Sequence, residues 1–150
     1  MSVLLALALS STLATRGAPQ TPACPDGTTL DTNRCFNDRL ERANADLSRY
    51  VAAVRARLRG EAKEAQSGDT SVADAAKGFE AAEKAWSSYR DAACGAVYSY
   101  WSGGTLRDVE DLDCQIRLTR LHTHTIWLQW LTYMDSTPPI LPEPPVPPDD

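Results

Sequence analysis

Apolar residues recur at alternating spacings of three and four along three long stretches of the chain, residues 36–58, 72–97 and 109–130. This spacing places them on one face of an α-helix, because a helix turns once every 3.6 residues. The face opposite the first stripe carries mostly arginine and glutamate, as expected of a solvated surface. Many positions of the second stripe are alanine, which lets a neighbouring helix approach closely. The pattern therefore predicts three long helices that pack against one another.

Capping and turn residues separate these stripes. Thr28, Thr29 and Asp31 offer side-chain oxygens that can cap the start of the first helix. Residues 67–70 (Ser-Gly-Asp-Thr) interrupt the helical pattern, so the second helix should begin near residue 70 or 71. We expect the third helix to extend to about residue 134, where a proline-rich segment follows.

The pair Gly103 and Gly104 lies midway between Cys94 and Cys114. The glycines supply the backbone freedom for a helix end and a tight turn, and Thr105 should cap the third helix. If both flanks are helical, each cysteine lies about 15 Å from the turn, at the same height on two antiparallel helices. Inward-facing cysteines on packed helices reach disulfide distance. The spacing predicts a disulfide-stapled helical hairpin.

The four cysteines allow three pairings. We favour Cys24–Cys35 together with Cys94–Cys114, because the hairpin geometry enforces the second pair. The predicted fold class is therefore all-α: a three-helix antiparallel bundle, up-down-up, stapled by two disulfides. A disulfide framework is typical of an oxidising compartment, so we expect an exported protein, located in the periplasm or outside the cell.

Both ends of the chain differ from the helical domain, which we place at residues 24–135. Residues 1–18 suggest a signal peptide, with an apolar run too short to span a bilayer and no Lys or Arg before it. A lipid anchor on Cys24 is not expected, because residues 21–23 lack the lipobox leucine and lipidation would leave Cys35 unpaired. Residues 136–150 predict an extended proline-rich tail, either a spacer or disordered. The alternative for this tail is a docking motif for a proline-recognising partner.

Length and charge narrow the class of protein. With 150 residues, the chain is long enough for one domain with a single core. A net charge of -5 argues against nucleic acid or an anionic membrane as the partner and favours a neutral or basic one. The cysteine spacing is not that of a metal site, and His122 and His124 point to different faces of a helix. We therefore expect no metal, no cofactor and no transmembrane segment, and the pattern assigns no oligomeric state.

No catalytic set is evident in the chain. Neither histidine lies near a serine or cysteine that could act as a nucleophile in a helical hairpin, and all four cysteines are assigned to disulfides. The carboxylates of Asp108 and Asp111 suit the start of a helix, where they interact favourably with the helix dipole. The sequence therefore predicts a binding protein and not an enzyme.

The segment that precedes Cys94 contains Trp86, Tyr89, Arg90 and Asp91. Trp86 and Tyr89 fall on the apolar stripe, so both are expected in the core. Counting through the turn, Trp86 lies level with His122 and Tyr89 with Thr119. Arg90 and Asp91 most simply make an inter-helix ion pair or hydrogen bonds.

The tip of the hairpin is the candidate partner-binding surface. Three aromatic residues there cannot all face one neighbour, because adjacent helix positions point apart. Aromatic side chains beside charged ones are favoured at protein interfaces. The alternative is that they cover the end of the bundle. The residues concerned are Tyr98, Tyr100 and Trp101, beside Asp108, Glu110 and Asp111.

Taken together, these motifs resemble the LprI-like lysozyme inhibitor family, which comprises small secreted or lipid-anchored bacterial envelope proteins. The resemblance extends over residues 24–128 and is carried by Trp86-x-x-Tyr89-Arg90-Asp91-x-x-Cys94, Gly103-Gly104-Thr105, Cys114 and Leu118-Thr119. It departs from the family at His122, where an arginine is usual, and in lacking an evident anchoring cysteine. The resemblance implies an all-α, disulfide-stabilised fold and, for the name-giving member, inhibition of lysozyme.

The leading hypothesis is therefore a lysozyme inhibitor that binds a muramidase non-covalently and occludes it. One alternative is a non-inhibitory envelope module, whose partner contacts the proline-rich tail or the end near Trp127 and Trp130. A third is a small periplasmic stress protein with no partner.

Overall fold

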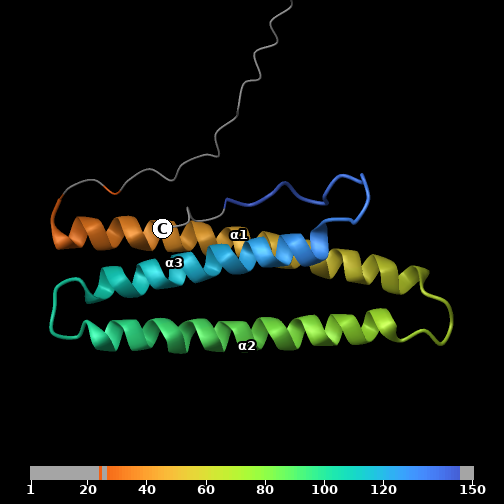
Figure 1. The fold of residues 1–150 in the computed structure, drawn as a ribbon, viewed down its shortest axis with the longest axis horizontal. Helices are drawn as coiled ribbons and strands as arrows, with labels where there is room; N and C mark the ends of the chain where they lie inside the picture. Colours follow the sequence, from red (N-terminus) through yellow and green to blue (C-terminus); the bar gives the residue numbers. More distant parts are fainter. Residues whose placement is uncertain (1–23, 25–26, 146–150) are drawn as a thin grey trace, which may run out of the picture.

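The computed structural model describes residue 24 and residues 27–145, and this part of the chain contains three α-helices and no strand. The helices are α1 (Thr29–Glu64), α2 (Ser71–Tyr100) and α3 (Arg107–Ile126), and α3 continues into one π-helical turn, η1 (Trp127–Leu131). They run up-down-up, with α3 packed against both α1 and α2 (Figure 1). The predicted all-α, three-helix architecture is confirmed.

The first two helices begin where the sequence predicts, although Thr70, the N-cap of α2, makes no side-chain capping bond. Thr28 is the N-cap of α1, and its hydroxyl accepts a hydrogen bond from the Asp31 amide while the Asp31 carboxylate accepts one from the Thr28 amide. This reciprocal capping box satisfies two amide groups that the helix itself leaves without partners. The turn before α2 contains Gly68 with φ of 95°, a left-handed conformation that favours glycine.

The third helix departs from the prediction at both ends. It begins at Arg107 with Leu106 as its N-cap and no side-chain cap, so the expected cap by Thr105 was wrong. The helix with its π-turn ends at Leu131 and does not reach residue 134. The last carbonyl groups instead accept bonds from outside the helix: the Ile140 amide donates to Leu131, and the Arg57 guanidinium to Trp130.

The core lies where α1, the first half of α2 and the C-terminal end of α3 meet. Tyr50, Val54 and Leu131 are almost fully buried, and Phe79 meets the Trp130 ring edge-on at 5.4 Å. Small residues at Ala75 and Ala76 pack against this cluster from α2. The members of the cluster are Tyr50, Val51, Val54, Leu58, Phe79, Ile126 and Leu131.

Two disulfides are present, with the predicted pairing of Cys24 with Cys35 and Cys94 with Cys114. Cys94 and Cys114 are both buried and join α2 to α3. The stapled helical hairpin is therefore confirmed.

The proline-rich tail is the main correction to the predicted fold. Residues 136–145 are neither a free spacer nor disordered, because they turn back and run along α1 (Figure 1). Leu141 packs against the core, and Pro144 is buried. The predicted signal peptide, and residues 146–150, lie outside the described residues. None of the described helices is long and apolar enough to cross a membrane.

Candidate functional site

The segment 86–91 lies at the middle of the bundle, where it connects all three helices. The Trp86 indole stacks on the His122 imidazole with ring centroids 4.0 Å apart and planes 7° from parallel. His122 Nε2 lies 2.8 Å from Glu83 Oε1, and both of these side chains are largely buried. The predicted level of Trp86 with His122 is confirmed, and the carboxylate of Glu83 is a partner that the sequence pattern did not indicate.

Arg90 completes this inter-helix network. Its guanidinium lies 5.1 Å from the centre of the Trp86 ring and donates to Asn44 Oδ1 on α1 and to Thr119 Oγ1 on α3. Thr119 is fully buried. The expectation of inter-helix hydrogen bonds from Arg90 is therefore confirmed, whereas its ion pair with Asp91 joins neighbours on the same helix. This network ties α2 to α1 and to α3 at one level of the bundle.

The expected core position of Tyr89 was wrong. Tyr89 is 60% exposed, and Asp91 is also exposed. The reason is helical phase: Arg90 turns inward to reach Asn44 and Thr119, so the preceding residue, about 100° away around the helix, faces solvent.

The hairpin tip exposes all three of its aromatic residues, to different degrees. Tyr100 is 84% exposed, Trp101 38% and Tyr98 36%, and the two neighbours Tyr100 and Trp101 meet edge-on with centroids 5.8 Å apart. Leu106, at the start of α3, adds a further exposed apolar side chain that sequence reasoning missed. Tyr100 therefore extends from the end of the bundle, whereas Tyr98 and Trp101 are more than half covered.

The turn itself is tight without unusual backbone angles. The Gly104 amide donates to the Trp101 carbonyl at 2.9 Å. Neither Gly103 nor Gly104 has a positive φ, so the predicted need for glycine freedom at this turn was wrong. The Arg107 guanidinium lies 5.3 Å from the centre of the Tyr98 ring and also pairs with Asp108 at 3.7 Å. These contacts order the base of the tip and leave Tyr100 extended into solvent.

The acidic residues beside the tip are half-buried. Asp108 Oδ2 accepts a hydrogen bond from Asn33 Nδ2 at 3.3 Å, which ties the start of α1 to α3. Burial raises the pKa of Asp111, and the carboxylates of Asp108 and Asp91 raise it further, while a hydrogen bond from Gln115 opposes them. The carboxylate of Asp111 is therefore less stable in its charged form than an exposed aspartate.

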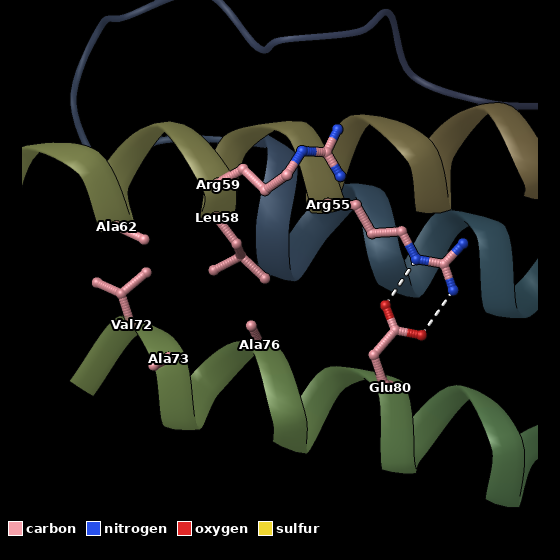
Figure 2. Close-up of a pocket in the computed structure, with 8 residues that line it drawn as sticks. All are labelled: Arg55, Leu58, Arg59, Ala62, Val72, Ala73, Ala76 and Glu80. Atoms are coloured by element: carbon pink, nitrogen blue, oxygen red, sulfur yellow. Dashed lines mark hydrogen bonds and ion pairs between the residues drawn. The ribbon is translucent and has the colours of Figure 1, made fainter. Parts of the chain in front are cut away.

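A separate cavity lies at the opposite end of the bundle, between the end of α1 and the start of α2 (Figure 2). Its volume is about 210 Å³, below the usual range of small-molecule sites. In Figure 2, Leu58 and Ala62 of α1 point toward α2, and Val72 and Ala76 of α2 point toward α1. Arg55 spans to Glu80 with two hydrogen bonds of 2.6 Å. Alanines of α2 leave this space because their side chains are too short to fill it, and it contains no set of groups suited to catalysis.

No group of three or more metal-ligating side chains gathers within residues 27–145 or at Cys24. The two histidines have different partners. His124 pairs with Glu143 of the tail at 3.1 Å, and His122 pairs with Glu83.

The family model described as lysozyme inhibitor LprI matches residues 22–125. This match spans more than half of the chain, and the chain therefore belongs to the LprI family. No curated protein and no solved structure matches the chain significantly.

Proposed function

We propose that this member of the LprI family is an exported lysozyme inhibitor, which binds a muramidase non-covalently through the tip of the α2–α3 hairpin. The family description supports the activity. The two disulfides support a location in the periplasm or outside the cell, where such bonds persist.

The observation that carries the choice of surface is the exposure of Tyr98, Tyr100 and Trp101 together at one end of the molecule. Aromatic side chains dominate the binding energy of protein interfaces, because they bury large areas with few rotatable bonds. The Cys94–Cys114 bond joins the two helices of the hairpin about 15 Å below the turn, which limits their movement relative to one another. A rigid surface loses little conformational freedom on binding.

Charge supports a basic partner. The protein has a net charge of -5, and Asp108, Glu110 and Asp111 flank the tip. Lysozymes are commonly basic, so the opposite charges would steer the two proteins together and speed their association. In this mechanism the tip covers the substrate cleft and excludes the glycan. No group of the inhibitor takes part in chemistry.

The test is the clearing of a bacterial cell-wall suspension by lysozyme, with the oxidised protein added at increasing concentration and at several salt concentrations. We expect dose-dependent inhibition that weakens as salt rises, because salt screens the steering charges. Tyr100→Ala and Trp101→Ala should each raise the half-inhibitory concentration at least tenfold. The matched control is Tyr89→Ala, an exposed aromatic on the same helix but away from the tip, which should leave inhibition unchanged.

An absence of inhibition at micromolar excess, against both animal-type and goose-type lysozymes, would contradict the proposal. Equal losses for the Tyr89 and Tyr100 variants would contradict the choice of surface. The alternative of an envelope module that binds through the Trp127–Trp130 end has less support, because Trp130 packs on Phe79 and Trp127 is bonded to the tail.

A further inference from the structure

The tail is held by a defined set of contacts and not by its connection alone. It begins after η1, beyond the last residue matched by the family model. The Ile140 amide donates to the Leu131 carbonyl, and Glu143 pairs with His124. Leu141 packs against the buried core cluster. We refer to the surface that receives the tail, formed by Tyr50, His124, Trp127 and Leu131, as the tail-binding face.

Two aromatic side chains of this face donate hydrogen bonds to backbone carbonyl groups of the tail. The Trp127 indole Nε1 donates to the Leu141 carbonyl at 2.9 Å, and the Tyr50 hydroxyl donates to the Pro142 carbonyl at 2.7 Å. Tyr50 is nearly fully buried, so its hydroxyl has a fixed position from which to donate. Two successive carbonyls are thus bound by donors that come from α1 and from the end of α3.

This pattern suits a proline-rich peptide in particular. Proline has no backbone N–H but keeps its carbonyl, which is a good acceptor. In the bound segment, Pro142 and Pro144 have no N–H that would need a partner, and the Ile140 N–H donates to the Leu131 carbonyl, so side-chain donors to the carbonyl groups supply most of what this backbone needs. Aromatic surfaces with such donors are the means by which known peptide-binding domains recognise extended proline-rich segments. Pro144 is buried in the same run, which adds an apolar contact beyond the hydrogen bonds.

We propose that the tail-binding face is a recognition site for proline-rich peptides, occupied in cis by residues 140–144 and able to bind the same sequence in trans. The chemistry it selects is an apolar pair followed by prolines and one carboxylate, as in Ile140-Leu141-Pro142-Glu143-Pro144. This site is independent of the proposed lysozyme contact, because it lies along α1 and η1, away from the tip of the α2–α3 hairpin (Figure 1).

Occupation in cis limits what the intact protein can bind. A short connection holds the tail at an effective concentration in the millimolar range, so an added peptide of similar affinity cannot compete. Breaking the connection after folding removes this advantage without removing any residue. The exchange of the tail for an added peptide then measures recognition by the face itself.

The experiment uses the full chain with a protease recognition sequence inserted between Ser136 and Thr137, in the exposed loop. The oxidised protein is cleaved after folding and titrated with a fluorescent peptide of residues 137–145, while anisotropy is recorded. We expect the nicked protein to bind the peptide at least tenfold more tightly than the uncut protein does. A peptide carrying Leu141→Asp should not bind, because its charge would enter the apolar core contact.

A pair of tyrosine variants separates recognition from general stability. In nicked protein, Tyr50→Phe removes one hydroxyl donor and should weaken binding about two- to twelvefold. The matched control is Tyr89→Phe, which removes the hydroxyl of an exposed tyrosine and should bind the peptide unchanged. Equal affinities for the two variants would overturn the proposal.

The nicked protein could lose its fold when the tail dissociates. We therefore also measure its helix content by circular dichroism, so that the test gives a clear result in that case as well. Loss of helix on dilution of the nicked protein, with recovery when the peptide is added, supports the proposal, because folding is then coupled to peptide binding. Failure of millimolar peptide to bind a helical nicked protein, or to restore an unfolded one, overturns it. Neither result involves lysozyme, so the proposed inhibition is tested separately.

Discussion

Removal of the Cys94–Cys114 disulfide should destabilise the bundle more than any single surface change. The perturbation is the double substitution Cys94→Ala with Cys114→Ala. Alanine is preferred to serine because both positions are buried, and a serine hydroxyl there would need a hydrogen-bond partner.

The expected magnitude follows from the loop that the bond closes. The two cysteines are separated by 20 residues, for which the chain-entropy model gives about 3 kcal/mol of stabilisation. For a chain of this size, that free energy corresponds to a fall in Tm of roughly 6–12 °C. The other disulfide, Cys24–Cys35, has a separation of 11, so the same model gives a value lower by about 0.5 kcal/mol.

The assay is thermal unfolding followed by far-ultraviolet circular dichroism, with and without a reductant. The wild-type protein and the Cys24→Ala, Cys35→Ala variant both keep the Cys94–Cys114 bond, so reduction should lower their Tm by at least 6 °C. The Cys94→Ala, Cys114→Ala variant should already melt at a low temperature and respond less to reduction. A Tm within 2 °C of wild type for this last variant would refute the argument that the hairpin is stapled by this bond.

Four further substitutions test the packing and charge arguments. Arg90→Leu leaves the buried Thr119 hydroxyl without its guanidinium donor, and we expect the free energy of unfolding in urea to fall by about 1–3 kcal/mol. The control is Arg55→Leu, which breaks an exposed ion pair and should lower the same free energy by no more than about 1 kcal/mol. Phe79→Ala opens a cavity beside Trp130 and should cost about 3–5 kcal/mol in urea unfolding, and a cost below 1 kcal/mol would contradict the assigned core. Burial raises the pKa of Asp111 in the folded state above the ordinary aspartate pKa of 3.8. Its protonated form therefore favours folding at pH values below 3.8, and this contribution is lost as pH rises through the raised pKa. Asp111→Asn should therefore stabilise the protein at neutral pH, and this gain should vanish below pH 3.8 in urea unfolding measured across pH.

The helices and the disulfide hairpin could be predicted because both depend on local spacing. A stripe of apolar residues defines a helix face whatever it packs against, and Cys94 and Cys114 are equidistant from the turn. The capping box of Thr28 and Asp31 is local for the same reason. The placement of Trp86 level with His122 followed from counting residues through one short turn, whereas the stacking of their rings is seen only in the structure.

Tyr89 and the tail could not be predicted because their positions depend on contacts between distant residues. Residues 89 and 90 both lie near the apolar stripe, and the choice between them is made by Asn44 and Thr119, which only the folded bundle brings to Arg90. The sequence of the tail predicts a spacer because proline excludes helix. Proline does not, however, prevent an extended segment from packing against the bundle. Its placement depends on Tyr50, which donates a hydrogen bond across 92 positions of sequence.

The two ends of the bundle use the same residue types in opposite ways. At the tail end, the hydroxyl of Tyr50 and the indole of Trp127 both donate to the chain itself, and Trp130 and Phe79 cover one another. At the tip, Tyr100 extends into solvent although an aromatic ring gains free energy on leaving water. The tail thus binds the Trp127 and Tyr50 side chains, although Tyr133 stays 40% exposed nearby, whereas Tyr100 at the tip is 84% exposed. This asymmetry is the physical reason to look for the lysozyme contact at the tip and for the peptide site at the tail-binding face.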